Sequence, residues 1–275
     1  MAYPSDQELA HIAELARRAR VSVLAMLSVA HSGHLAGSLG MADVFAALYG
    51  YALRHNPAEP EWVERDRLIL SNGHIAPIRY ATMAHVGYMP LEELTTLRRF
   101  GSRLQGHPER THLPGLETTS GPLGDGLPQA AGIALAATMD EAQYHTYVLT
   151  SDGEHQCGIV WEAVMFAAKN RLGNLTNIIA RNRIQIGGDT EDVMPLEPLA
   201  EKYEAFNWHV QEVDGHNVEM FLEVLDAARA VTDKPSVIVA HTIPGKGVPE
   251  IEGDYRWHGK APSEEQAKKW IAALG

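Results

Sequence analysis

Five apolar runs, each ending in a polar or glycine-containing turn, constrain the fold of this chain more than any other feature. They read "DRLILSNGH", "YHTYVLTSDG", "NLTNIIARN", "WHVQEVDGH" and "PSVIVAHTIPG". Patterns with helical spacing separate them, and strands that alternate with helices of this length form a parallel sheet. We therefore expect an α/β fold, a parallel sheet with helices on both faces, whose ligand binds beyond the carboxyl ends of the strands.

Length and composition favour a single domain, and a protein of the cytoplasm. The 275 residues can bury one large α/β core, so residues 1–275 are assigned to a single domain. Lysine and arginine total 23 against 35 acidic residues, and the net charge of −12 argues against a nucleic acid or an anionic membrane as the partner. A single cysteine fits a reducing compartment, and the longest apolar stretch, residues 21–30, is too short to span a bilayer.

Two segments carry further local signals. Ser5 and Glu8 form a capping-box pattern that predicts the start of a long helix. Residues 101–126 contain six glycines and three prolines without sustained periodicity, which is typical of a functional loop. The helix expected after this loop begins with small residues, and either ligand binding at its amide end or ordinary close packing would explain them.

Polar side chains follow two of the apolar runs. Asp152 ends "YHTYVLTSD", and Asn182 ends the next run 30 positions later. On neighbouring parallel strands their oxygens would converge, and with a carbonyl and phosphate oxygens they would form the ligand set that Mg²⁺ prefers. From spacing alone a structural interpretation is equally open, in which Asp152 caps the helix that begins near Gly158 and Asn182 makes a turn.

Four histidines lie beside glycine in loop-like contexts. His34, His74 and His107 each follow a glycine, and His258 precedes one. Backbone freedom beside an imidazole suits a closely approached ligand. Zinc binding by His31 and His34 is a weaker interpretation, because no cysteine or carboxylate partner set lies nearby. Four other histidines are expected at the surface: His11, His55, His145 and His209.

In combination these motifs resemble one family. They occur in the order "SGHLAGSLG", "LSNGHIAP", "LQGHPE", "GPLGDG", "SDGE" with "ARNRIQIGG", and "IPGKG" with "WHGKAP", and they cover nearly the whole chain. The set resembles the N-terminal, diphosphate-binding half of transketolases, and most closely the A-type chain of split transketolases. The "SDG" and "RN" pair is similar to the fingerprint of thiamine diphosphate enzymes, usually GDG followed at about this distance by asparagine.

The resemblance implies a cofactor site. Asp152, Asn182 and the backbone carbonyl of Ile184 would hold Mg²⁺, or Ca²⁺ or Mn²⁺ in its place, which bridges the diphosphate of thiamine diphosphate. The residues implied to contact the cofactor are His74, Gly121, Leu123, Gly124, Gly153, Asn182, Ile186 and His258.

The resemblance also implies catalytic roles. His74 and His258 would contact the diphosphate or the sugar near the reacting centre, while His34 and His107 would bind hydroxyl groups of the donor ketose. Neutral imidazoles can donate or accept at hydroxyls and assist proton transfer at neutral pH. Glu162 would lie at the subunit interface, in a network that links paired active sites.

Five positions depart from the family pattern. Ser151 replaces the first glycine of GDG, and Leu35 replaces a proline common after the first histidine. Ala180 stands where an acidic residue is usual, and Asp125 stands where glutamine is usual, and these two concern cofactor orientation. Cys157 stands where related A-type chains often have glutamate, and we expect it to be a small buried side chain.

The implied activity is that of a transketolase, which moves a two-carbon glycolaldehyde unit from a ketose, or ketose phosphate, to an aldose or its phosphate. In the family, a glutamate of the pyrimidine-binding domain activates the cofactor. We expect that domain on a separate B-type subunit, together with most of the sugar-phosphate contacts, in a heterotetramer of two A-type and two B-type chains.

Three alternatives remain. The chain could serve another thiamine diphosphate-dependent carboligase in specialised biosynthesis, which the sequence does not separate from a transketolase. A non-catalytic paralogue is suggested by Ser151, Ala180 and Asp125, against the intact Asp152 and Asn182. A dinucleotide-binding oxidoreductase is disfavoured because no G-x-G-x-x-G turn follows the first predicted strand.

Overall fold

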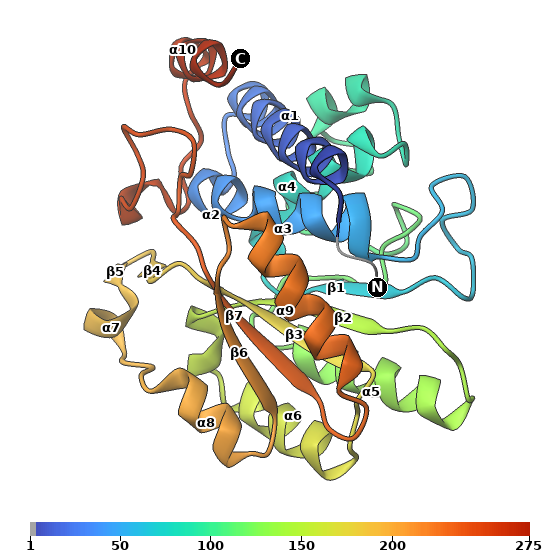
Figure 1. Cartoon of the computed structure of the whole chain (residues 1–275). Helices are drawn as coiled ribbons and strands as arrows, with labels where there is room; N and C mark the ends of the chain where they lie inside the picture. Colours follow the sequence, from blue (N-terminus) through green and yellow to red (C-terminus); the bar gives the residue numbers. More distant parts are fainter. Residues whose placement is uncertain (1–3) are drawn as a thin grey trace.

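A single parallel sheet organises the computed structural model, which describes residues 4–275 (Figure 1). Its five strands run in the order β1-β2-β3-β7-β6, and every pairing between them is parallel. Their bounds are β1 (Arg67–Leu70), β2 (Thr146–Ser151), β3 (Leu175–Arg181), β6 (His209–Asp214) and β7 (Ser236–His241). Each strand falls within one of the five apolar runs, so the predicted α/β fold is confirmed.

Burial of the central strands explains why their sequences read as continuous apolar runs. Every residue of β2 and of β3 is buried. A parallel sheet covered on both faces leaves neither side of such strands in water, so polar alternation is lost. The edge strand β6, in contrast, is buried only at Val213.

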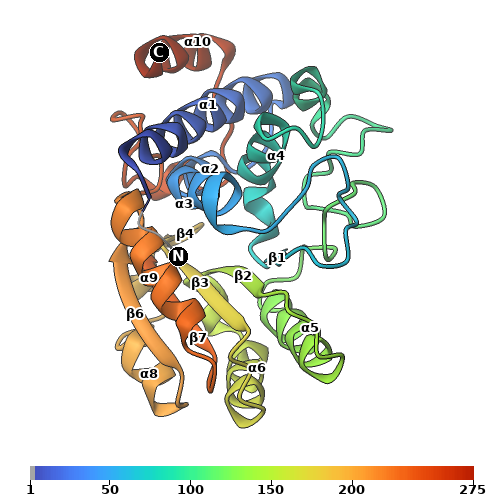
Figure 2. The same cartoon turned by 45° about the vertical axis from the view of Figure 1, so that its right-hand side comes forward.

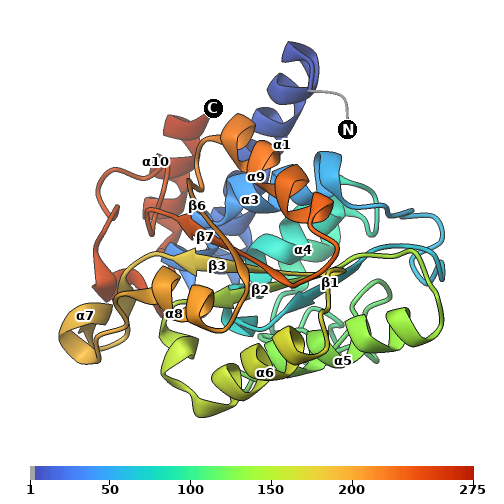
Figure 3. The same cartoon turned by 60° about the horizontal axis from the view of Figure 1, so that its bottom comes forward.

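Helices cover both faces of the sheet (Figures 2 and 3). Figure 3 shows α5, α6 and α8 on one face and α3, α4 and α9 on the other. The helices of the first face are α5 (Gly126–Met139), α6 (Gly158–Lys169) and α8 (Leu199–Ala205). Those of the second face and its outer layer are α1 (Asp6–Ala30), α2 (Leu35–Gly40), α3 (Ala42–Ala47), α4 (Ala76–His85), α9 (Val218–Ala230) and α10 (Glu264–Leu274).

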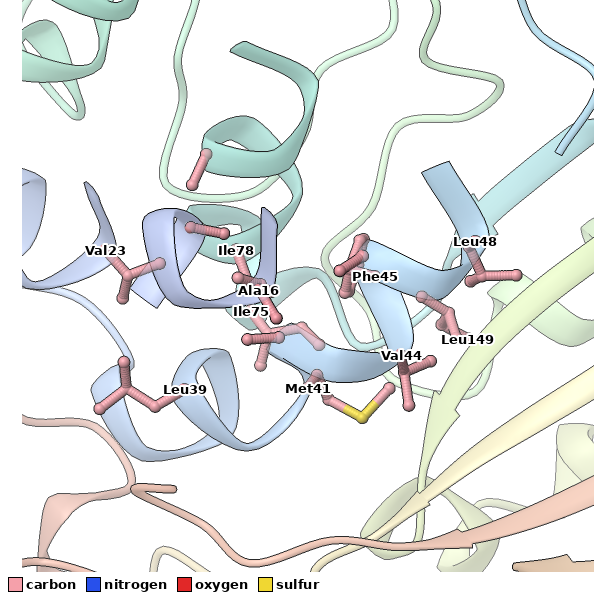
Figure 4. Packing of buried hydrophobic residues seen from close by; sticks show 14 of the residues in the cluster. Ala16, Val23, Leu39, Met41, Val44, Phe45, Leu48, Ile75, Ile78 and Leu149 are labelled. Atoms are coloured by element: carbon pink, nitrogen blue, oxygen red, sulfur yellow. The ribbon is translucent and has the colours of Figure 1, made fainter. Parts of the chain in front are cut away.

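The larger hydrophobic core lies between the second face of the sheet and α1. Figure 4 shows Phe45 of α3 between Leu149 of β2 and Ile78 of α4, with Val44 beside Leu149. All four side chains are fully buried. This layer therefore fixes α2 and α3, and with them the start of α2 at the carboxyl edge of the sheet.

Local signals behave as the sequence predicts. The Ser5 hydroxyl accepts from the Glu8 N–H at 3.3 Å, and the Ser5 N–H donates to the Glu8 carboxylate at 2.8 Å, so the capping box starts α1. In the described stretch between Thr96 and Gly126 there is no helix or strand, as expected for the loop. Among residues 4–275, no helix combines the length and the apolarity that a membrane crossing needs.

Short elements complete the carboxyl edge. A two-stranded antiparallel hairpin, β4 (Ile184–Gln185) and β5 (Gly188–Asp189), follows β3, and the short helix α7 (Thr190–Val193) follows the hairpin. The remaining elements are a π-helix, η1 (Leu48–Ala52), and four 3₁₀ turns, η2 (Gly73–Ile75), η3 (Leu91–Thr96), η4 (Gly153–Gln156) and η5 (Tyr255–Trp257).

Candidate active site at the carboxyl ends of the strands

A cavity of about 510 Å³ lies where β1, β2 and β3 end. Ser151, Ala180 and Asn72 belong to its wall, each within two residues of the end of a strand. Most of the predicted site residues also line it, namely His34, His74, His107, Gly121, Leu123, Asp152, Gly153, Asn182, Ile184, Ile186 and His258.

Two predicted site residues lie outside the cavity wall. The Gly124 N–H donates to a buried carboxylate oxygen of Glu154 at 2.8 Å, which places Gly124 behind the wall. Glu162 is exposed on α6 and does not line the cavity. Its implied role at a subunit interface stays a prediction.

Strand register brings Asp152 and Asn182 to one edge. Ser151 of β2 pairs with Ala180 of β3, and each chain then turns into the cavity. Asp152 is the N-cap of the short 3₁₀ turn η4, and Cys157 is the N-cap of α6. The structural alternative is therefore wrong in expecting Asp152 to cap α6. The turn alternative is correct for Asn182, whose side-chain oxygen accepts from the Ile184 N–H at 3.0 Å.

Asp152 is held by a buried arginine that the sequence reasoning missed. Its Oδ2 accepts from Arg181 Nη1 at 2.9 Å and from the Arg183 N–H at 2.8 Å, while Oδ1 accepts from the Gly153 N–H at 2.8 Å. Burial raises the pKa of the Asp152 carboxyl, and the Arg181 guanidinium and the two N–H groups oppose that rise. A charged residue inside the apolar run "NIIAR" was the available signal for this ion pair.

Arg181 extends the same network to α7. The Arg181 side chain is 0% exposed and also bonds Glu191 and Glu197, both at 2.7 Å. The guanidinium therefore ties the end of β2 to the segment that follows the β4–β5 hairpin. Charge-assisted hydrogen bonds of this kind are stronger than neutral ones and hold the carboxylates in place.

Three of the histidines form one cluster. The ring centroids of His34 and His74 lie 5.0 Å apart, those of His34 and His258 5.4 Å, and those of His74 and His258 5.2 Å. His34 is the N-cap of α2, His74 lies within the short turn η2, and His258 is the C-cap of η5.

The cavity histidines are neutral near pH 7. Burial, with a smaller contribution from His258, lowers the pKa of His34 to about 4. Burial also lowers the pKa values of His74 and His258. For His107 the pKa is lowered by burial and by the nearby Arg98 cation. Neutral imidazoles offer one donor and one acceptor each, which suits hydroxyl groups of a polyol.

Gly73 shows why the histidine loops lie so close together. A Cβ at this position would come within 2.6 Å of the Ser120 side chain and 3.3 Å of the His107 ring. Only glycine allows η2 to pack this closely against the loop that carries His107.

The cavity fits a polar ligand. Four buried side-chain atoms of its lining residues have no hydrogen-bond partner among the described residues: His34 Nδ1, Asn72 Oδ1, Gln185 Nε2 and His258 Nδ1. Buried polar groups are nearly always satisfied, so such atoms indicate a bound group or water. Gly121, with nothing within 4 Å of the place of its absent Cβ, leaves room beside them.

The predicted metal ligands include too few charged side chains to hold a metal ion without a further ligand. Among residues 4–275, no group of three His, Cys, Asp or Glu side chains is arranged to hold a metal, which also gives the zinc interpretation no support. Asp152 is the one carboxylate in the predicted set, beside an amide and a carbonyl. Such a set suits Mg²⁺ that also binds phosphate oxygens, since Mg²⁺ is commonly held by few protein ligands together with phosphates.

Four of the departures from the family pattern lie at or near the cavity. The Ser151 N–H donates to Glu154 Oε2 at 2.6 Å. Ala180 lies in the cavity wall, and Asp125 begins α5 without a side-chain cap. Cys157 is only partly buried, against the expectation of a buried side chain, and its pKa is raised by burial and by Glu154.

Comparisons with known proteins give a consistent family. Residues 12–275 match the family model described as transketolase, thiamine diphosphate binding domain. The 6-deoxy-6-sulfo-D-fructose transketolase subunit SqwG of Clostridium sp. (strain MSTE9) is 41% identical, over 97% of this chain and 96% of that protein. The A-type chain of the apulose-4-phosphate transketolase of Phocaeicola vulgatus is 40% identical, over 88% of this chain and 86% of that protein.

Solved structures agree. Transketolase from Leishmania mexicana superposes with a TM-score of 0.91 at 35% identity, over 96% of this chain. This chain covers 41% of that longer protein and 41% of Transketolase 2 of Escherichia coli, to which it is 39% identical.

Proposed function

Because the chain belongs to the family of transketolase thiamine diphosphate-binding domains, we propose that it is the N-terminal subunit of a split transketolase. The complete enzyme transfers a two-carbon glycolaldehyde unit from a ketose, or ketose phosphate, to an aldose or aldose phosphate. One observation carries the proposal: Asp152, Asn182 and the four glycine-flanked histidines line one cavity at the carboxyl ends of the strands.

The cofactor in this proposal is thiamine diphosphate with Mg²⁺. Asp152, Asn182 and the Ile184 carbonyl would hold the metal, and His74 and His258 would contact the diphosphate or the sugar near the reacting centre. When bound, the cofactor supplies the nucleophilic carbon needed to break and form carbon–carbon bonds. The residues proposed to pack against it are Gly121, Leu123, Gly124, Gly153 and Ile186.

The chain itself contributes a neutral, partly buried surface for a sugar. His34 and His107 hydrogen-bond ketose hydroxyls, and their lowered pKa values keep them uncharged, able to donate or accept protons near pH 7. The names of two relatives specify sugars that carry a phosphate or a sulfo group. A ketose with an anionic end is therefore included in the proposal.

A second chain completes the site. Ile186 is 76% exposed and Leu123 45% exposed, although both line the cavity. Exposed apolar side chains beside a ligand site are typical of a surface that a partner covers. We propose a B-type subunit with the pyrimidine-binding domain, in an A₂B₂ assembly, with Glu162 at the interface. A cytoplasmic location is also proposed, on the basis of the single cysteine.

Asp152→Ala in the reconstituted complex tests the proposed metal site. We expect the change to abolish Mg²⁺-dependent binding of thiamine diphosphate, measured by titration calorimetry. The exposed Asp140→Ala is the matched control, because Asp140 lies at the far end of α5 and should leave binding unchanged. Retained binding in Asp152→Ala would contradict the assignment of the metal ligands.

A further inference from the structure

Glu154 is a fully buried carboxylate that has no role in the proposed chemistry. Its side chain is 0% exposed and does not line the cavity. Oε1 accepts from the Ser71 hydroxyl and from the Gly124 N–H, the latter at 2.8 Å. Oε2 accepts from the Ser151 N–H at 2.6 Å and from the Ser151 hydroxyl at 3.1 Å. All four donors are uncharged, so hydrogen bonds alone replace the lost hydration of this group.

The donors come from three segments that are far apart in the sequence. Ser71 follows the end of β1, directly before Asn72 and three residues before His74. Gly124 belongs to the glycine loop whose Gly121 and Leu123 line the cavity, and Ser151 directly precedes Asp152. One carboxylate thus joins the three segments that carry the proposed diphosphate, cofactor and metal contacts.

Ser71 strengthens this connection. While its hydroxyl donates to Glu154, its oxygen accepts from the Gly126 N–H at 3.0 Å, at the first residue of α5. The start of α5, the glycine loop and the end of β1 are consequently fixed to one another through two side chains.

The geometry requires two acceptor oxygens at residue 154. The Gly124 and Ser151 N–H groups belong to the backbone and cannot reverse their polarity, and each points at a different oxygen of Glu154. A glutamine amide has only one oxygen, so either orientation places its NH₂ group against one of these N–H groups. A buried donor left without an acceptor costs the full desolvation penalty of that group.

We propose that Glu154 is a positioning residue for cofactor binding. Its carboxylate holds the glycine loop and the Ser151–Asp152 turn at the spacing that thiamine diphosphate and Mg²⁺ require. This inference rests on the proposed function. It concerns the arrangement of the chain itself, because the carboxylate holds the segments together before any ligand contacts them.

Glu154→Gln tests the inference by two readouts. In the complex with the B-type partner, the Kd for thiamine diphosphate at saturating Mg²⁺ should rise at least about tenfold by calorimetry. In the chain alone, amide hydrogen exchange of residues 121–126 should become at least about tenfold faster. The second readout requires neither the cofactor nor activity.

Thr150→Val is the matched control for lost stability. Thr150 is buried on β2 beside Ser151, and its hydroxyl donates to Asn177 at 2.9 Å, away from the cavity. The control should lower the unfolding midpoint and leave the Kd for thiamine diphosphate within about twofold. If Glu154→Gln does not fold, Ser71→Ala replaces it as the test variant. In Ser71→Ala the Kd for thiamine diphosphate should rise at least about threefold.

The outcomes separate the inference from the proposed function. Binding in the wild-type complex with an unchanged Kd in Glu154→Gln, or in Ser71→Ala where that variant replaces it, would overturn the positioning role. An equal loss of affinity in Thr150→Val would also overturn it, because general destabilisation would then explain the effect. No binding in the wild-type complex would contradict the proposed function and the inference built on it.

Discussion

His107 is the histidine best suited to separate sugar binding from cofactor binding. It lies on the loop between η3 and α5, whereas His34, His74 and His258 form the cluster deeper in the site. Its position in the cavity wall and its lowered pKa support its proposed role as a neutral hydrogen-bonding group for a ketose hydroxyl.

His107→Ala should raise the KM for the donor ketose about tenfold, the cost of roughly one lost hydrogen bond. The Kd for thiamine diphosphate should change by less than about twofold. His112→Ala is the control, because His112 is exposed on the same loop and does not line the cavity. An unchanged ketose KM would count against the role of His107.

Arg181 is a buried charge that pairs with three carboxylates. Its side chain is 0% exposed and bonds Asp152, Glu191 and Glu197. Removing one partner of a buried ion pair leaves the other charge uncompensated.

Arg181→Met should therefore lower the free energy of unfolding by about 3 kcal/mol, measured by urea denaturation. Arg256→Met is the control, because Arg256 pairs with Asp254 at the surface and its own side chain is 76% exposed. The unfolding midpoint of this variant should hardly differ from that of the wild type. Equal effects of the two substitutions would show that the Arg181 network does not stabilise the fold.

At the level of elements, α6 presents an apolar surface that the chain itself does not cover. Ile159 is 38% exposed, Met165 50% and Phe166 42%, and Glu162 lies on the same helix. Aromatic and methionine side chains are enriched where subunits meet. This surface is consistent with the proposed position of Glu162 at an interface.

Phe166→Asp should weaken association with the B-type partner at least about tenfold by analytical ultracentrifugation, because truncated aromatic anchors commonly cost more than about 1 kcal/mol. The control is Met220→Asp on α9, which lies on the other face of the sheet and is 47% exposed. The far-ultraviolet circular dichroism of both variants should match the wild type. Unchanged association of Phe166→Asp would remove α6 from the interface.

The elements also show what the sequence could and could not predict. Apolar runs predicted every strand of the main sheet, and the prediction is clearest for β2 and β3, which are buried on both faces of the sheet. The turn residues after β2 and β3 predicted that Asp152 and Asn182 would share an edge, which the register confirms. Arg181 and Glu154 were missed because their partners come from other segments, such as Ser71, 83 positions before Glu154, and no periodic pattern records such pairs.

At the scale of the whole molecule, buried neutral histidines make stability depend on pH. Burial lowers the pKa of His145 and of His155 to about 4. His145 was expected at the surface, but it is 9% exposed and bonds the Thr176 hydroxyl at 2.8 Å. Its burial follows from its place before β2, which no local pattern reveals.

The sign of the effect follows from proton linkage. A histidine in the unfolded chain has a pKa of about 6.5. Between about pH 6.5 and 4 the unfolded chain therefore binds protons that the folded chain does not. Stability is fully present above about pH 6.5 and falls as the pH falls toward about 4. The slope is at most about 1.4 kcal/mol per pH unit for each such histidine.

His145→Gln should reduce the slope of the unfolding free energy against pH by an amount close to that of one bound proton. Urea denaturation between about pH 7 and pH 5 measures this slope. His11→Gln serves as the control, since His11 is exposed on α1 and its removal should leave the slope unchanged. Equal slopes for wild type and His145→Gln would mean that the pKa of His145 is the same in the folded and unfolded chains.

The most direct test of the split-transketolase assignment is a calorimetric titration of thiamine diphosphate and Mg²⁺, first into this chain alone and then into its mixture with a B-type transketolase subunit. We predict binding only in the mixture, together with transfer of a two-carbon unit from a ketose to an aldose. No binding in either sample would contradict the assignment and favour a non-catalytic protein of the same fold.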